Sequence, residues 1–405
     1  MSPTITRPIT RGRLPVLLLL ACLAVMAAAC GEPDHSNDFG TVVVPPGQPL
    51  AIGVSIALSG DSSGDAERIE RGVRLAVEQV GEVKGHPIEV IVKDDGCSAE
   101  QSVAVAKAFS AMPNVAGVIG PMCSSGCVPA SVIYDDARMM MLTPSCTTSV
   151  LTGQVLDTVV RLAWNGQEAA IGGAKFADKE LDTSHVFAIN DSTFYGKQQR
   201  DAFKEALKQR GGHLIADEYV EATDWDFTAL VGQIREAQPD LIYYAGFLPA
   251  GRFLIQQIRY AGITAPFMGS DALIDVDAFI RESNGAAEDA FVTQARPVEG
   301  KKFGAFADAY RARWDEEPGP FSAQAYDAAV VLLEAVEDTA KRRDGALEID
   351  RKALSEAVLR TDHQGASGKV RFFPNGERVP EDVVVAVIKQ VRGDRFETVE
   401  EYEVE

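Results

Sequence analysis

Residues 115–147 read VAGVIGPMCSSGCVPASVIYDDARMMMLTPSCT. Val115–Ile119 and Met139–Leu142 are short apolar runs typical of strands, and residues 125–137 between them are expected to form a helix. A strand, a helix and a second strand in this order predict a βα unit with both strands parallel in one sheet. A polar segment follows each strand, so the two segments should meet at the carboxyl edge of that sheet.

The same alternation extends to both sides of this segment and restarts after Trp164. Further strands are predicted at residues 52–58, 88–92, 186–190, 214–219, 241–245 and 266–268, with helices between them. Residues 301–361 are predicted to be mostly helical, and Arg392–Asp394 is a hairpin turn signal between strands at 383–388 and 396–404. Two successive βα arrays predict an α/β protein with two doubly wound, Rossmann-like lobes rather than one long sheet.

The N-terminal segment has the pattern of an export signal. Three Arg precede an apolar run, Leu14–Ala29, that is too short for a lasting membrane span and ends in small residues. The end Ala27–Cys30 resembles a bacterial lipobox, in which Cys30 receives lipid after cleavage of a signal peptide at 1–29. Cleavage of an ordinary signal peptide after Ala29, or an uncleaved anchor, are the alternatives. Either way the chain is expected to be exported, to the periplasm or the outer face of the cell membrane.

Residues 30–50 are rich in Gly, Pro, Asp and Ser. This composition predicts a lipidated N-terminus followed by an extended, solvated linker, with folded structure from Ala51 onward.

The bulk composition excludes several classes of function. The chain has 405 residues and a formal net charge of −20, which argues against nucleic acid and against binding anionic lipid through a basic face. The five His are scattered, and the chain has no CxxC pair, GxSxG motif or P-loop ending. We therefore expect no metal, no cofactor and no enzymatic activity.

Six Cys are present, of which Cys22 lies in the signal and Cys30 is the lipid site. The remaining four are Cys97, Cys123, Cys127 and Cys146. An even number in an exported chain suggests disulfides, although a free thiol at Cys127 or Cys146 stays open at this point.

Several short segments carry a family resemblance. They are Asp94–Cys97, Gly120–Ser125, Pro129–Ser131, Thr143–Thr147, Asp191, Tyr195–Gly196, Asp240–Gly246 and Phe267–Asp271. In this order and spacing they resemble the type I periplasmic binding proteins, and most closely the leucine/isoleucine/valine-binding branch that serves ABC importers. The resemblance covers nearly all of the mature chain.

This resemblance implies a fold and a function. Three crossovers would join lobe 1, residues 51–165 and 296–377, to lobe 2, residues 166–295 and 378–405, with a Cys97–Cys123 disulfide. The expected monomer would capture an amino acid, branched-chain or related and possibly polar, between the lobes. It would then deliver this small molecule to the permease subunits of an ABC importer. A second disulfide between Cys127 and Cys146 is left open, because its geometry cannot be checked from sequence.

A carboxylate site is expected where the strands of the first lobe end. Ser124 and Thr147 each follow a strand at a predicted helix start, where free N–H groups and the helix dipole favour an anion. Their hydroxyls, together with Ser145 and the backbone near Cys146, would bind the carboxylate. The alternative is that Ser124 and Thr147 only cap their helices.

The second lobe is expected to supply the opposite charge. By the resemblance, Asp271 would face the ammonium of the ligand and Tyr195 would close over it; alternatively, Asp271 is a helix N-cap. The leucine-binding branch has Trp in its first βα loop where this chain has Asp65. Asp65 and Arg68 would instead bind a polar side chain of the ligand. Apolar surface would come from Met122, Phe247, Phe321 and Ala323, although each of these is more often simply a core residue.

Two other functions remain open. Proteins of this fold also serve as sensors that signal to a membrane partner, and relatives bind urea, short amides or aromatic acids. The carboxylate of Asp271 favours an amino acid.

Overall fold

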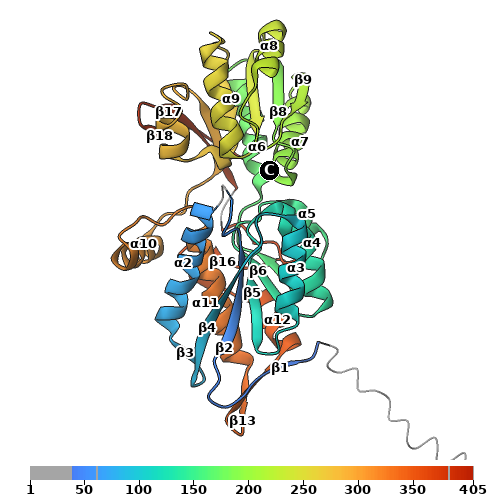
Figure 1. The fold of residues 1–405 in the computed structure, drawn as a ribbon, viewed down its shortest axis with the longest axis vertical. Coiled ribbons are helices and arrows are strands. Elements are labelled where there is room, and N and C mark those ends of the chain that lie inside the picture. Colours follow the sequence, from blue (N-terminus) through green and yellow to red (C-terminus); the bar gives the residue numbers. More distant parts are fainter. Residues whose placement is uncertain (1–38, 61–62, 382–383, 405) are drawn as a thin grey trace, which may run out of the picture.

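The computed structural model describes residues 39–60, 63–381 and 384–404. The predicted signal peptide at 1–29 and the predicted lipid site Cys30 lie outside these residues. Two lobes are stacked along the long axis of the molecule, each built on its own sheet (Figure 1).

The sheet of lobe 1 has the strand order β3-β4-β2-β5-β6-β7. All neighbours are parallel except β3 and β4, which form an antiparallel hairpin. Its strands are β2 (Leu50–Ile56), β3 (Glu82–Val83), β4 (His86–Asp94), β5 (Val115–Ile119), β6 (Met140–Thr143) and β7 (Val159–Arg161). Every residue of β2 and β5 is buried, because helices cover both faces, and such strands read as continuous apolar runs.

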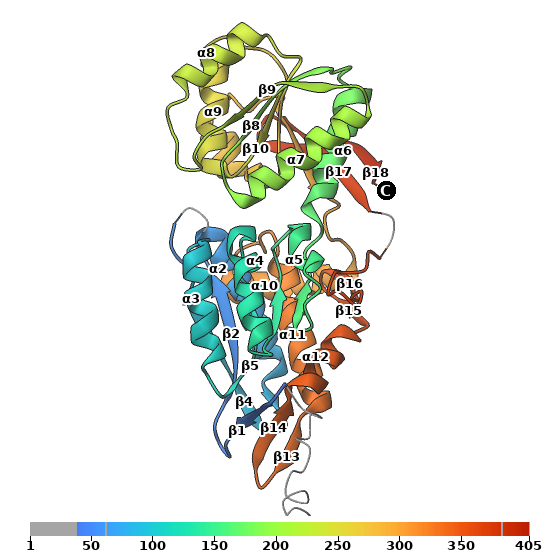
Figure 2. The ribbon, with the colours of Figure 1, turned by 90° about the vertical axis from the view of Figure 1, so that its right-hand side faces the viewer.

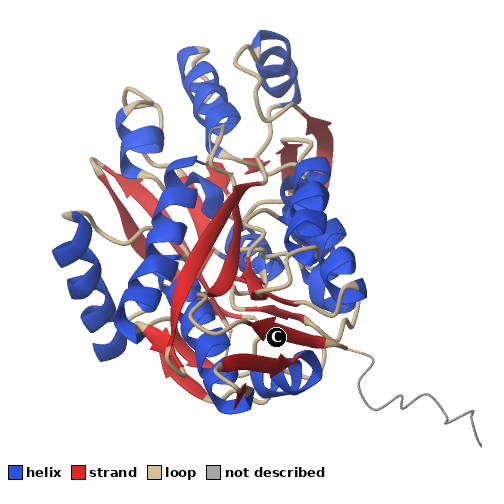
Figure 3. Cartoon of the chain, turned by 60° about the horizontal axis from the view of Figure 1, so that its bottom comes forward, coloured by secondary structure: helices blue, strands red, loops and turns tan. Residues whose placement is uncertain are grey.

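Helices pack on both faces of this sheet (Figures 2 and 3). The helices of lobe 1 are α2 (Ser63–Val80), α3 (Ala99–Ser110), α4 (Ser124–Asp136), α5 (Ser149–Gly153), α10 (Lys301–Trp314), α11 (Ser322–Thr339) and α12 (Arg351–Leu359). On one face, Ile69 and Val73 of α2 join Leu332 of α11 in a buried core, and on the other Phe109 and Tyr134 come from α3 and α4.

The sheet of lobe 2 has the order β18-β17-β12-β11-β10-β8-β9, with β17 antiparallel to both of its neighbours. Its strands are β8 (His185–Asn190), β9 (His213–Tyr219), β10 (Leu241–Ala245), β11 (Phe267–Gly269), β12 (Phe291–Ala295), β17 (Val385–Arg392) and β18 (Arg395–Glu403). Its helices are α6 (Gly166–Lys179), α7 (Phe194–Gln209), α8 (Thr228–Ala237) and α9 (Leu248–Tyr260), with the short turns η2 (Asp271–Leu273) and η3 (Val276–Arg281).

The chain passes between the lobes after β7, after β12 and before β17. Two doubly wound lobes joined by three crossovers, the fold class expected from the sequence, are thus confirmed. The predicted hairpin turn at Arg392–Asp394 also joins the last two strands, β17 and β18.

One expectation from the sequence is wrong: part of the predicted linker is strand β1 (Thr41–Val44), so folded structure begins before Ala51. Residues 301–361 are mostly helical, as predicted, but residues 341–350 within them form β13 (Lys341–Arg343) and β14 (Ala346–Asp350), joined at an Asp344–Gly345 turn. Strand β1 pairs with β14 far along the chain, with Thr41 opposite Asp350, and its Val42 and Val44 are completely buried in the core of lobe 1. Short β15 (His363–Gly365) and β16 (Gly368–Val370) form a further hairpin.

Within the described part of the chain, no helix is long and apolar enough to cross a membrane. No group of three or more His, Cys, Asp or Glu among those residues is arranged to hold a metal ion.

Candidate functional site

A cavity of about 680 Å³ lies between the two lobes, where the carboxyl ends of their parallel strands face each other. All eight candidate ligand-binding residues line this cavity: Asp65, Met122, Ser124, Ser145 and Thr147 from lobe 1, and Tyr195, Phe247 and Asp271 from lobe 2. The structure thus brings together side chains that span more than 200 positions of the sequence.

Ser124 is the first residue of α4 and is not its N-cap. Cys123 occupies the cap position, and its side chain makes no capping hydrogen bond. No N-cap side chain therefore accepts a hydrogen bond from the backbone N–H groups in the first turn of α4. Ser124 is only 5% exposed, and its hydroxyl forms no hydrogen bond with another of the described residues. The first turn of α4 therefore presents an unpaired hydroxyl to the cavity beside the positive end of the helix dipole.

Thr147 likewise does not cap a helix. The cap of α5 is its neighbour Thr148, whose hydroxyl accepts from the Val150 N–H at 3.2 Å. Thr147 is 4% exposed, and within the described ranges its hydroxyl has no hydrogen-bond partner. Ser145 differs, because its hydroxyl donates to the Met122 carbonyl at 2.9 Å. The capping alternative is therefore wrong for both Ser124 and Thr147, and their hydroxyls are available to a ligand.

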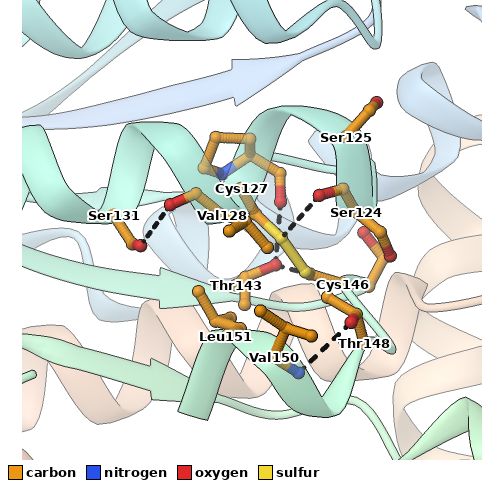
Figure 4. The surroundings of a disulfide bond; sticks show 12 residues. Ser124, Ser125, Cys127, Val128, Ser131, Thr143, Cys146, Thr148, Val150 and Leu151 are labelled. Carbon is orange, nitrogen blue, oxygen red and sulfur yellow. Dashed lines mark hydrogen bonds between the residues drawn. A yellow bond between two sulfur atoms is a disulfide. The ribbon is translucent and has the colours of Figure 1, made fainter. Parts of the chain in front are cut away.

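Two disulfides hold these loops of lobe 1. Cys97–Cys123 ties the segment after β4 to the start of α4, with Cα atoms 5.2 Å apart. Cys127–Cys146 ties the first turn of α4 to the loop after β6, with Cα atoms 6.6 Å apart. The pairing implied by the resemblance is present. The pairing that was left open is also formed, so neither Cys127 nor Cys146 is a free thiol (Figure 4).

Asp271 and Tyr195 form the polar group on the lobe 2 side of the cavity. Ser270 takes the N-cap position of η2, so Asp271 is its first residue and not its cap. The Tyr195 hydroxyl donates to Asp271 Oδ1, and burial raises the pKa of the Asp271 carboxyl to about 6. The rings of Tyr195 and Phe247 lie 5.0 Å apart. Lobe 2 thus offers a carboxylate within an aromatic wall.

Asp65 lies in the first turn of α2 and pairs with Arg68 at 3.2 Å. Both side chains line the cavity and both remain partly exposed. This wall of lobe 1 therefore carries a charged pair.

The sequence analysis expected apolar surface from Phe321 but did not anticipate Trp164 at the first crossover. Trp164 lies three residues after the end of β7 and stacks on Phe321, with ring centroids 4.6 Å apart and an interplanar angle of 25°. Phe321 adopts a left-handed backbone, with φ of +62°, in the loop before α11. The distance between the two residues in sequence hides the pair, although an aromatic residue shortly after a strand was a usable signal. The cavity also includes Ile274, Val276, Gln294, Pro318 and Pro320.

Two facing lobes with a partly polar cavity between them define a two-lobed binder of small solutes. The family model for "Periplasmic binding protein" matches residues 49–394, and the chain belongs to this family. Its members are exported to the periplasm and bind solutes without catalysis, so the expectation that this chain is not an enzyme is confirmed.

Similar proteins support the assignment. The chain is 27% identical to the leucine-, isoleucine-, valine-, threonine-, and alanine-binding protein of Pseudomonas aeruginosa, over 80% of this chain and 87% of that one. Its fold is similar to the branched-chain amino acid transporter substrate-binding protein LivJ of Streptococcus pneumoniae in complex with isoleucine. That match has a TM-score of 0.76 and 23% identity, and covers 88% of this chain and 100% of the other.

A solute-binding protein of an ABC transporter from R. palustris, in complex with benzoate, has a TM-score of 0.75 and 18% identity, and the match covers 88% of this chain and 97% of the other. The same fold thus occurs with an amino acid and with an aromatic acid.

Proposed function

We propose that this protein captures an amino acid between its lobes and delivers it to an ABC importer. The observation that carries the proposal is the separation of opposite polarities across one cavity. Lobe 1 presents the unpaired hydroxyls of Ser124 and Thr147 at a helix start, and lobe 2 presents the carboxylate of Asp271. A zwitterion would satisfy both walls at once, and hydrogen bonds in which one partner is charged are stronger than those between neutral groups.

The ligand side chain is proposed to be branched-chain or related. The stacked pair Trp164 and Phe321, with Met122 and Phe247, offers an apolar surface. The pair Asp65–Arg68 adds a polar region that would accept a hydroxyl or amide. Binding of leucine, isoleucine, valine, threonine and alanine by the relative from P. aeruginosa supports a site of this mixed character.

Binding of an aromatic acid is a second candidate function. The benzoate complex of the R. palustris protein and the aromatic lining of this cavity favour it. The Asp271 carboxylate weighs against it, because an aromatic acid brings no ammonium group to pair with a partly buried carboxylate.

Export as a lipid-anchored protein is part of the proposal and depends on the sequence of Ala27–Cys30. In this arrangement Cys30 would hold the protein at the membrane, where the importer works, and the protein would act as a monomer. A sensor of the same fold would use the same anchor and differ only in its membrane partner. Replacement of Cys30 by Ala should release the protein from the membrane fraction and leave ligand affinity unchanged.

The first test of the ligand is a binding titration. The chain from residue 31, refolded to remove bound solute, is titrated calorimetrically with leucine, isoleucine, valine, threonine, alanine and benzoate. A ligand at a hundred times its Kd should also stabilise the fold by about 2.7 kcal/mol in thermal unfolding. Binding of an amino acid supports the proposal. Binding of benzoate alone supports the second candidate, and no binding of either contradicts both.

A further inference from the structure

Asp191 is a buried carboxylate next to the cavity that does not line it. It follows β8 and is 1% exposed. Its Oδ1 accepts from the backbone N–H of Thr193 at 3.1 Å and from the Thr193 hydroxyl at 2.5 Å. Its Oδ2 accepts from the backbone N–H of Phe247 at 2.8 Å. One carboxylate therefore joins the β8–α7 loop to the β10–α9 loop.

Both loops carry cavity aromatics. Thr193 is the N-cap of α7, and its hydroxyl accepts from the Gly196 N–H at 3.0 Å, which fixes the first turn that contains Tyr195. Phe247 is the N-cap of α9 and places its ring 5.0 Å from that of Tyr195. The relative position of these two rings thus depends on Asp191.

The Asp191 side chain fits its place because two of its neighbours, Gly196 and Gly246, have no side chain. A Cβ added to Gly246 would lie 2.6 Å from Cβ and Cγ of Asp191, and a Cβ added to Gly196 would overlap Asp191 Oδ1. Three donors converge on it, so an acceptor-only side chain is required. An amide would turn its own N–H groups toward at least one of these donors, which costs a buried hydrogen bond.

We propose that Asp191 is a positioning residue of the ligand site, which sets Tyr195 against Phe247 and so aims the Tyr195 hydroxyl at Asp271. The proposal deepens the proposed function and rests on it for its effect on affinity. Its structural half, the coupling of the two loops, can be measured without ligand.

Asp327 offers a matched control. It is also completely buried and also accepts from two backbone N–H groups and one hydroxyl, those of Ala366 at 2.8 Å and of Ser367 at 2.7 and 2.5 Å. Asp327 holds the β15–β16 hairpin against α11 and does not line the cavity. Asp191→Asn and Asp327→Asn therefore remove similar bonds from different places.

The experiment compares these variants with wild type by calorimetric titration with leucine and isoleucine and by amide hydrogen exchange. Asp191→Asn should raise the Kd at least tenfold and speed exchange at residues 193–197 and 247–251. Asp327→Asn should speed exchange at 366–367 and leave the Kd unchanged. In a double-mutant cycle, Asp191→Asn should raise the Kd much less in a Tyr195→Phe background than in wild type. The reason is that both changes affect the same contact, that of the Tyr195 hydroxyl with Asp271.

The outcomes separate this proposal from the proposed function. If wild type binds neither leucine nor isoleucine, nor any other amino acid in the titration that tests the proposed function, the proposed function fails, and exchange at 247–251 still decides whether Asp191 couples the loops. If wild type binds and Asp191→Asn binds equally well, the positioning role is overturned. Should Asp191→Asn fail to fold, Thr193→Val removes the hydroxyl bond to Asp191 together with the N-cap bond from Gly196, and leaves the bond from Asp191 to Phe247 in place. It is expected to give a smaller rise in Kd, with an unchanged Kd counting against the proposal.

Discussion

The pH dependence of ligand binding should report the charge of the ligand through Asp271. Burial raises the pKa of this carboxyl to about 6 in the free protein. A bound ammonium group would stabilise the ionised form and lower the pKa again, so binding releases a proton near pH 6. The contribution of Asp271 to affinity is therefore present above pH 6 and is lost as the pH falls through 6.

The size of the effect follows from the ionised fraction of Asp271. With a pKa of about 6, roughly nine-tenths of the free protein is ionised at pH 7 and roughly one-tenth at pH 5. If only the ionised form binds, the Kd of an amino acid rises about tenfold between these pH values, or about 1.4 kcal/mol. The Kd of a plain anion such as benzoate should change with pH in the opposite direction and fall between pH 7 and pH 5. The reason is that protonation of Asp271 removes its repulsion of the anion.

The assay is calorimetric titration of leucine or isoleucine at pH 5, 6 and 7, on wild type and on Asp271→Asn. The variant should bind about tenfold more weakly than wild type at pH 7, because it lacks the charge-assisted contact, and its Kd should be nearly constant over this range. A wild-type Kd that does not change between pH 5 and pH 7, or a variant that shows the same change as wild type, would refute the assignment of Asp271 to the ammonium.

Three further predictions concern stability. Replacement of both Cys127 and Cys146 by Ala opens a loop of sequence separation 19 and should cost about 3 kcal/mol in denaturant unfolding, whereas an unchanged midpoint would contradict this. Gly376→Ala should lower the free energy of unfolding by about 2 kcal/mol or more, because Gly376 has φ of +78° and an added Cβ would overlap a carbonyl oxygen of β7. The control Gly211→Ala has φ of +90° but open space around the added Cβ, and it should lower the free energy of unfolding clearly less in the same thermal unfolding assay. Glu168→Gln should stabilise the fold by up to about 2 kcal/mol at pH 8 and have no effect at pH 4. Burial raises the pKa of Glu168 to about 7 from 4.5, so the wild type loses stability as the pH rises from 4.5 to 7 and the Gln variant does not; equal urea midpoints at pH 8 would refute this.

The parts of the fold that depend on local pattern could be predicted from the sequence. The strands and helices around residues 115–147 were predictable because buried parallel strands are continuous apolar runs separated by helices. The site was predictable for a related reason, since the carboxyl ends of such strands meet at one edge, which brings Ser124 and Thr147 together.

Features that depend on pairing across the chain were not predictable. Strand β1 has only four residues, and its pairing with β14 is revealed by no local pattern. The stack of Trp164 on Phe321 and the bonds from Asp191 to Phe247 also join segments far apart in sequence. The second disulfide stayed open for the same reason, because the spacing of Cys in a sequence does not give the distance between their Cα atoms.

The two walls of the cavity are held in different ways, and this difference bears on how a ligand would be received. On lobe 1, disulfides restrain the start of α4 and the loop after β6. On lobe 2, the corresponding loops are held by hydrogen bonds to Asp191 and by the contact of Tyr195 with Asp271. Covalent links keep their geometry when the site is empty, whereas hydrogen-bonded loops adjust at a lower cost in free energy. Within the proposed function, lobe 1 would therefore present a preformed site for the carboxylate, and the side chains of lobe 2 would complete the site around the ammonium.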